Sequence, residues 1–374
     1  MTSHSGELPW WANGILLPLA NLILAFAVSG LVLLAIGEDP LDCARLMLAG
    51  AFGYGEGISY TLFYATNFIF TGLAFAVAFH AGLFNIGAEG QAYVAGLGVA
   101  AVCLPLDFLP QPLIILLAVL ASAAFGAAWA FLPAYLQAKR GSHIVITTIM
   151  FNFIASSLVV YLLVNHLSAP GSMAPETRNF AENARLPYLA DLFGAIGIWA
   201  PPAPLNLAFI FALICAALVA FLISRTRLGY EIRTFGANPK AAVYAGMSPL
   251  KLTITAMMIS GALAGFLALN EIMGSQNRML LGFTGGYGFV GIAVALMGRS
   301  TSLGIVLAAI LFGALYQGGA DLAFDKPGVT RDMVVLIQGL VILLAGALEH
   351  MFRPQLVRLF ARFRPRATAV AEVN

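Results

Sequence analysis

Charged residues are scarce in this sequence. Asp, Glu, Lys and Arg make up only 10% of its 374 residues, whereas soluble domains carry about 25%. Hydrophobic residues make up 60%, an excess that one globular core cannot bury. The composition therefore predicts an all-α, polytopic membrane protein, and the small net charge of +2 gives no indication of a nucleic-acid partner.

Cysteine and the motifs of common enzymes are equally sparse. Cys43, Cys103 and Cys215 lie far apart, so they indicate neither a disulfide framework nor a thiolate metal site. No Gly-Lys dipeptide occurs, which excludes a Walker phosphate loop, and neither HExxH, a CxxC pair nor a serine elbow is present. The sequence therefore predicts no enzyme, metal site or cofactor in this chain.

Long apolar windows are what the chain has instead, and we count ten of them as membrane spans. The N-terminus lacks a basic region before the first window, so this window is expected to be a retained span and not a cleaved signal. The eighth and ninth windows are short for crossing a bilayer alone. The predicted spans cover residues 14–36, 59–79, 92–104, 113–135, 144–165, 205–224, 252–269, 288–297, 303–316 and 333–348.

Basic residues alternate between the predicted loops as the positive-inside rule requires. With a cytoplasmic N-terminus, most Lys and Arg fall inside, and the proline-rich insertion at residues 166–204 becomes an irregular external loop. Both termini are then cytoplasmic. Residues 352–374 form a basic tail, which either lies on anionic lipid as a short helix or is a solvated tail that only fixes topology.

One polar break interrupts the apolar sequence at residues 83–96. Its sequence, LFNIGAEGQAYVAG, places Asn85, Glu89 and Gln91 among three glycines. An ionisable side chain at bilayer depth costs at least about 2.5 kcal/mol, so Glu89 must face protein, a cavity or an aqueous helix end. Asn85 could cap a helix that starts at Ile86, and the same break could present polar groups to a substrate, as in many transporters.

A second glycine-rich break lies at residues 281–297, LGFTGGYGFVGIAVALM. Its glycines are followed by small and β-branched apolar residues, as in the first break, and the two start on opposite sides in the predicted topology. Corresponding breaks in two pseudo-related halves are typical of inverted repeats and point to a site near the midplane. Gly and Ala are also common wherever membrane helices pack closely.

Two further segments carry candidate functional residues. In TTIMFNFIA (147–155), Asn152 either makes interhelical hydrogen bonds or recognises a flat heterocycle together with the flanking aromatic rings. In the predicted cytoplasmic loop 225–251, Asn238-Pro239 can start a short helix that Gly246 ends. That helix either closes the bundle or docks into a soluble partner.

The segments LFNIGAEGQ, TTIMFNFIA and GANPKAAVYAGMSPLK, in this order and spacing, resemble the permease subunits of bacterial ABC importers for nucleosides. This group belongs to a wider permease family that also serves simple sugars and branched-chain amino acids. The resemblance covers nearly the whole chain and implies a ten-span fold of the cobalamin-importer type in the bacterial inner membrane. It also implies three partners: a second homologous permease, a cytoplasmic ATPase that binds the ATP and Mg, and a periplasmic or lipid-anchored substrate-binding protein.

The resemblance also assigns residues. It implies that 225–251 is a coupling loop, in which the matching residues are Gly236, Asn238, Pro239, Ala241, Ala242 and Gly246. The substrate path would use aromatic rings to stack on a base and amides to read its edge; the candidates are Phe84, Asn85, Glu89, Gln91, Phe151, Asn152 and Tyr287. Ser142-His143 stands where the family usually has an Asn-Glu pair, a departure that bears on the ligand more than on the fold.

The leading hypothesis is thus the transmembrane subunit of an ATP-driven importer for a nucleoside, with residues 1–374 as one permease domain. A simple-sugar permease of the pentose type is the nearest alternative. A carrier driven by an ion gradient, with Glu89 as its proton site, is the alternative from another class. A membrane enzyme acting on a lipid-linked substrate ranks last, because no nucleophile or metal constellation gathers in the sequence.

Overall fold

The computed structural model describes residues 17–169, 171–195, 197, 201, 203–326, 328–330 and 333–340. These residues are mostly helical, and their only β pairing consists of two isolated bridges, Glu176 with Leu280 and Tyr188 with Asn206. The all-α prediction is therefore confirmed. The predicted tail, 352–374, and the second half of the tenth predicted span lie outside the described residues.

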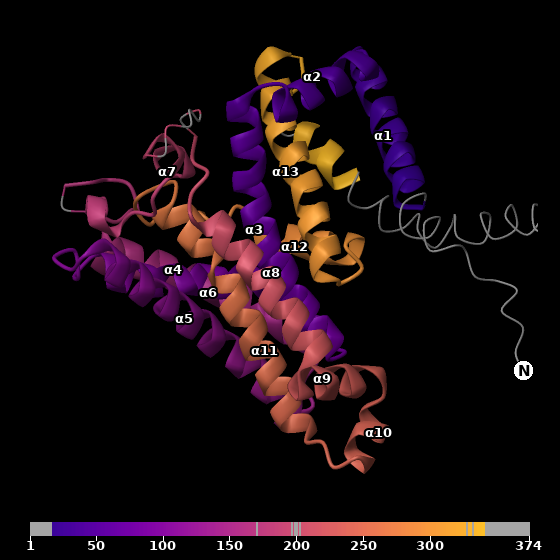
Figure 1. Ribbon diagram of the computed structural model, residues 1–374, viewed down its shortest axis with the longest axis vertical. Helices are drawn as coiled ribbons and strands as arrows, with labels where there is room; N and C mark the ends of the chain where they lie inside the picture. The colour runs from indigo at the N-terminus through magenta and orange to yellow at the C-terminus, as the bar shows by residue number, and fades with distance from the viewer. Residues whose placement is uncertain are drawn as a thin grey trace, which may run out of the picture. The chain divides into compact units, whose positions relative to one another are not determined.

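The elements follow one another as helices joined mostly by short turns; the longer connections are residues 163–207 and 274–286 (Figure 1). In chain order they are α1 (Leu17–Ile36), α2 (Pro40–Phe52), α3 (Gly55–His80), α4 (Ala88–Cys103), α5 (Gln111–Arg140), α6 (Ile144–Leu162), η2 (Leu163–Leu167), η3 (Glu182–Ala184), α7 (Leu189–Ala195), α8 (Ala208–Arg225), α9 (Arg227–Ala237), α10 (Pro239–Tyr244), α11 (Pro249–Gly265), η4 (Leu269–Met273), α12 (Tyr287–Met297) and α13 (Ser302–Asp325).

The chain divides into two units, residues 1–45 with 322–374 and residues 46–321. In the first unit, the Lys326 ammonium lies 3.2 Å from a Glu38 carboxylate oxygen and 2.8 Å from one of Asp42. Hydrogen bonds to these two carboxylates raise the pKa of Lys326. The three residues therefore tie the end of α13 to the start of α2.

Helix α3 is the centre of the second unit. Its most apolar window is 83% buried by protein, and α12, α11 and α8 pack along it. A helix that is apolar on all sides is expected in such a position. Helices α5 and α6 differ, since only 28% and 22% of their apolar windows are buried, so their outer faces are left for lipid or another subunit.

Six of the described helices are long and apolar enough to cross a bilayer. They are α3, α5, α8, α13, the continuous run from α6 into η2, and the run from α11 into η4. The remaining predicted spans correspond to α1, to α4, to α12 and to a helical segment at 333–340, each short of a full span or only partly described. The protein is a multi-pass membrane protein, and the count of ten stays a prediction.

Two helices, α2 and α9, occupy segments outside the predicted spans. Helix α2 starts at Pro40 with Asp42 in its first turn, where proline and a carboxylate suit a helix N-terminus. Helix α9 starts at Arg227, and its N-cap is Thr226, whose hydroxyl accepts a hydrogen bond from the Gly229 N–H at 3.0 Å. Both helices are too polar for a search based on long apolar windows.

The two predicted breaks begin at opposite ends of the second unit. The first follows His80, whose ring nitrogen Nε2 lies 3.0 Å from the Ser300 carbonyl oxygen and whose backbone packs on α9 at Gly236. The second follows a segment that pairs with the 166–204 region, where the Phe180 N–H donates to the Asn277 carbonyl at 2.7 Å. Figure 1 shows α9 and α10 at one end of α8 and α11, and α7 at the other.

Glycines allow α5 and α11 to pack backbone against backbone. A Cβ added at Gly126 would clash with the Gly261 carbonyl oxygen, and one at Gly261 would clash with the Gly126 oxygen. Such close approach of small residues is the usual way in which membrane helices associate. The α5–α11 contact therefore depends on the absence of both side chains.

Replacing Gly126 with Ala is expected to lower the free energy of unfolding by about 1–3 kcal/mol, because the new methyl group must displace α11. Thermal unfolding of the detergent-solubilised protein measures the change. Gly194→Ala is the matched control, since nothing lies within 4 Å of a Cβ at that position. Equal melting temperatures for the two variants would contradict the contact.

Candidate functional site

The first break is built around the Asn85 side chain, which is fully buried. Its Oδ1 accepts a hydrogen bond from the Gly87 N–H at 2.8 Å, an Asx turn that reverses the chain after α3. Its Nδ2 donates to Gln91 Oε1 at 3.1 Å and to Ser260 Oγ at 2.9 Å. Asn85 therefore caps the turn and not a helix starting at Ile86, because α4 begins only at Ala88.

Asn152 holds α6 against the same break. Its Oδ1 accepts from the Gly90 N–H and its Nδ2 donates to the Ile86 carbonyl, both at 2.9 Å. A Cβ at Gly90 would stand only 2.7 Å from Asn152 Oδ1, so glycine is required for this approach. The amide is thus bonded to backbone groups of the break, which favours the interpretation as an interhelical hydrogen bond over direct recognition of a heterocycle.

The Glu89 carboxylate joins the two breaks. Its Oε1 accepts a hydrogen bond from the Gly286 N–H at 3.0 Å, and its Oε2 accepts one from the Gly288 N–H at 2.8 Å. The Thr284 side chain also hydrogen-bonds to this carboxylate. Gly286 is the N-cap of α12 and Gly288 lies in its first turn, so Glu89 satisfies N–H groups that no carbonyl of the helix can reach.

The N-termini of α4 and α12 therefore meet at one carboxylate. Glu89 belongs to the first turn of α4, and a Cβ at Gly288 would stand 2.6 Å from the Glu89 Cα. A helix N-terminus carries about half a positive charge, so one carboxylate stabilises both ends. The two predicted breaks are therefore in direct contact, while a shared substrate site and a true sequence repeat both stay predictions.

Tyr287, in the first turn of α12, lies in a cluster of aromatic rings. Its ring centroid is 6.3 Å from that of Tyr64, 5.9 Å from that of Tyr316 and 5.6 Å from that of Phe68. The three tyrosines are half-buried, and Phe68 beneath them is fully buried. We call Tyr64, Tyr287 and Tyr316 the tyrosine cluster.

The other two predicted aromatic residues lie in separate groups. Phe84 packs edge-on against Phe75, with ring centroids 4.9 Å apart, near the other end of α3. The Phe151 ring packs on Trp129 at 5.4 Å, and the Trp129 indole N–H donates to the Phe151 carbonyl at 3.3 Å. The structure therefore brings the predicted amide residues together around the first break, whereas the three predicted aromatic residues lie in three separate groups of rings.

A second buried polar network was missed in the sequence. Asn67 Nδ2 donates to Glu271 Oε1 at 2.6 Å, and Asn270 Nδ2 donates to Asn67 Oδ1 at 2.9 Å. Asn206 extends the network from the start of α8 through its bond to Asn270 Oδ1 at 2.9 Å. Asn67, a polar residue inside the second predicted span, was the one sign of this network in the sequence, but its partner Glu271 lies 204 residues away.

The predicted coupling residues form a compact turn between α9 and α11. Asn238 caps α10 by accepting from the Ala241 N–H at 3.1 Å, Pro239 is its first residue, and Gly246 has φ +80° just beyond its end. Ala242 is fully buried. The outward face of α10 carries Tyr244, which is 93% exposed, and is thus the part that is open to a partner.

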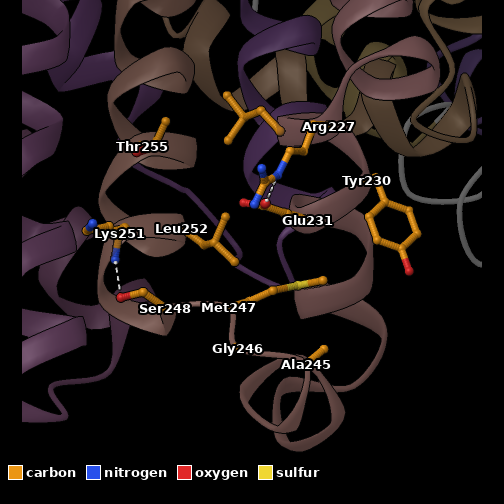
Figure 2. A pocket seen from close by; sticks show the side chains of 11 residues that line it. Arg227, Tyr230, Glu231, Ala245, Gly246, Met247, Ser248, Lys251, Leu252 and Thr255 are labelled. Carbon is orange, nitrogen blue, oxygen red and sulfur yellow. Dashed lines mark hydrogen bonds and ion pairs between the residues drawn. The ribbon is translucent and has the colours of Figure 1, made fainter.

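A cavity of about 610 Å³ lies between α9, the turn after α10 and the start of α11. Figure 2 shows the Arg227 and Glu231 side chains pointing toward each other across its upper edge, with an N–O distance of 2.8 Å. The ring of Tyr230 points away from the cavity. Among the described residues, no group of three His, Cys, Asp or Glu side chains is placed to hold a metal ion here or elsewhere.

A family model described as branched-chain amino acid transport system / permease component matches residues 57–346. The chain belongs to this permease family. It is therefore a membrane permease and not itself an enzyme. No solved structure matches the chain.

Several curated relatives match most of the permease. The guanosine ABC transporter permease NupP of Bacillus subtilis is 35% identical over 89% of this chain and 93% of its own length. The glucose ABC transporter permease TsgB13 of Haloferax volcanii is 34% identical over 89% of this chain and 87% of its own. The nucleoside ABC transporter permease NupB of Lactococcus lactis is 32% identical over 88% of this chain and 89% of its own.

Replacing Glu89 with Ala is expected to destabilise the permease, because the N–H groups of half-buried Gly286 and buried Gly288 lose their acceptor and an unmade bond costs about 1–3 kcal/mol where the donor is buried. Glu89→Gln keeps one acceptor oxygen, so its melting temperature should lie between those of Glu89→Ala and the parent. Thermal unfolding in detergent measures the order. Glu182→Ala, at an exposed loop carboxylate, is the control, and a Glu89→Ala variant as stable as this control would contradict the anchoring role.

Proposed function

We propose that this permease is the transmembrane subunit of an ATP-driven ABC importer that carries a nucleoside across the bacterial inner membrane. Two of the relatives described above are named for guanosine and nucleoside transport, at 35% and 32% identity. The glucose permease at 34% keeps a simple sugar as the second candidate. The finer fold assignment, ten spans of the cobalamin-importer type in two inverted halves, belongs to the same proposal.

The observation that carries the proposal is the meeting of two interrupted helices at Glu89. Transporters place their substrates where half-helix N-termini from two repeats approach each other, since free N–H groups and irregular backbone are tolerated there. In this chain α4 and α12 approach in that way, from opposite ends of the unit. We place the substrate path along the seam between α4 and α12.

Within this path, the predicted residues divide into two roles. Asn85, Gln91 and Asn152 fix the start of α4 through bonds to one another and to the backbone, so they shape the path. Glu89 anchors α12 in the same way. Of the three predicted aromatic residues, Tyr287 belongs to the first turn of α12 and so lies at the seam, whereas Phe84 and Phe151 pack in separate ring groups.

We further propose that α9 and α10 couple the permease to a cytoplasmic ATPase, which binds the ATP and Mg. The exposed face of α10 suits docking, while Gly236, Asn238, Pro239, Ala241, Ala242 and Gly246 build the turn that presents it. This assignment places both chain termini in the cytoplasm. A second permease subunit and an external substrate-binding protein complete the importer.

The alternative of an ion-gradient carrier assigns Glu89 a proton that it releases and rebinds in each cycle. Both carboxylate oxygens already accept hydrogen bonds from α12, at 3.0 and 2.8 Å. Protonation would remove an acceptor from a buried N–H group and weaken the anchor. Glu89 is therefore better suited to holding the two helices than to coupling transport to a proton gradient.

The complete importer, reconstituted in proteoliposomes with its binding protein and ATPase, is expected to take up radiolabelled guanosine or uridine when ATP is supplied. Excess unlabelled nucleoside should compete, and ribose or glucose should not. Competition by a sugar alone would replace the nucleoside proposal with the sugar alternative. Uptake by this chain without the ATPase, driven by a pH gradient, would refute the ABC assignment.

Tyr244→Ala is expected to reduce ATP-driven uptake at least about tenfold, because Tyr244 is the aromatic residue of α10, is 93% exposed, and large aromatic residues dominate protein interfaces. Binding of substrate by the external protein should not change. Tyr161→Ala, on the exposed face of α6, is the matched control. Uptake that is equal in the two variants would refute docking through α10.

A further inference from the structure

The tyrosine cluster is a three-sided arrangement of rings from three helices. Tyr64 comes from α3, Tyr287 from α12 and Tyr316 from α13, and their centroids are 5.8, 5.9 and 6.3 Å apart. Phe68 closes the base, with centroids 5.0 Å from Tyr316 and 5.6 Å from Tyr287. These are separations at which aromatic rings attract each other through their edges and faces.

The chemistry of this cluster differs from that of the other ring clusters along α3. Phe70, Phe211 and Phe266 form one group with centroids 4.8 to 5.8 Å apart, and all its rings are phenylalanine. The group around Phe75, Phe79 and Phe84 is also free of hydroxyl groups. Phe fills an apolar bundle at a lower free-energy cost than Tyr, because its side chain buries no hydroxyl group.

The tyrosines are also more open than a packing core requires. Phe68 and Phe312 beneath them are at most 1% exposed, whereas the three tyrosines are each half-buried. On α3, Tyr60 and Tyr64 precede Phe68 at intervals of four residues, so they share its helix face, and Tyr60 is 37% exposed. A column of rings thus runs from the interior toward the start of α3.

The cluster lies where α12 begins. Tyr287 stands between Gly286 and Gly288, whose N–H groups are held by Glu89. Farther along the same pair of helices, a Cβ at Gly72 of α3 would lie 3.3 Å from the Val294 side chain of α12, so the two helices run on together from the cluster. The rings therefore lie beside the point where α4 and α12 meet.

We propose that Tyr64, Tyr287 and Tyr316 form an aromatic site that takes the base of a nucleoside as it passes through the permease. The inference rests on the proposed function and adds Tyr64 and Tyr316 as residues that determine specificity. A nucleobase is flat and aromatic, so it can pack against the rings of this arrangement edge to face or with an offset stack. Ribose alone has no aromatic face for the cluster to bind.

Uptake of radiolabelled guanosine by the complete importer, with the binding protein saturated, tests the inference. Tyr64→Leu and Tyr316→Leu are each expected to reduce uptake about three- to tenfold, the loss of one aromatic contact. The matching Phe variants keep the ring and should stay within about twofold of the parent. Tyr161→Leu, an exposed tyrosine on α6, is the control for general effects of the substitution.

Photolabelling distinguishes contact from a merely structural role. An azido-purine nucleoside added to the complete importer should label peptides from α3, α12 or α13 that carry the cluster, and unlabelled guanosine should prevent it. Labelling confined to peptides around Phe84 or Phe151, or equal uptake by the Leu and Phe variants, would overturn the inference while leaving the importer proposal intact. A parent importer that takes up no nucleoside would overturn both, and would be seen before any variant is made.

Discussion

The structure depends on one carboxylate shared by two helix ends. An ionised side chain within a bilayer is costly, and so are backbone N–H groups at a helix N-terminus that lack an acceptor. Glu89 lowers both costs at once, because it lies in the first turn of α4 and accepts from Gly286 and Gly288 at the start of α12. Without α12 the carboxylate would lose two hydrogen-bond donors, and without the carboxylate the N–H groups of Gly286 and Gly288 would lose their acceptor. The two interrupted helices therefore define each other's position.

Glycine makes this arrangement geometrically possible. The carboxylate of Glu89 can reach two backbone N–H groups only if α12 comes within van der Waals contact of α4, and a Cβ at Gly288 would prevent this. Gly90 gives Asn152 the same access from α6, where a Cβ would stand 2.9 Å from the Asn152 Cα. The glycines in the two breaks thus act as contact surfaces for neighbouring backbones, more than as flexible points in the chain.

Much of this architecture could be predicted from the sequence, and the limits have physical causes. The breaks were visible because polar and glycine residues stand out against a long apolar background, and α10 was visible because Asn-Pro and Gly mark its ends. The partners could not be predicted: Asn85 pairs with Ser260 and Glu89 with Gly286, and local patterns contain no information about contacts 175 and 197 residues apart. Helices α2 and α9 were missed because amphipathic helices leave no long apolar window. The sequence also grouped Phe84, Phe151 and Tyr287 by residue type, whereas packing separates them.

The position of Gly236 indicates how a movement of the coupling region would reach the seam. A Cβ at Gly236 would clash with the His80 carbonyl oxygen and stand 2.8 Å from the Gly82 nitrogen, so α9 rests on the backbone of the turn between α3 and α4. No side chain lies between the two backbones to absorb a displacement by changing its rotamer. Asn85 and Asn152 hold the following residues against α11 and α6, and Glu89 holds them against α12. If an ATPase moves α10, as proposed, α9 transmits that movement to the turn between α3 and α4. This turn fixes the start of α4, and through Glu89 it also fixes the start of α12.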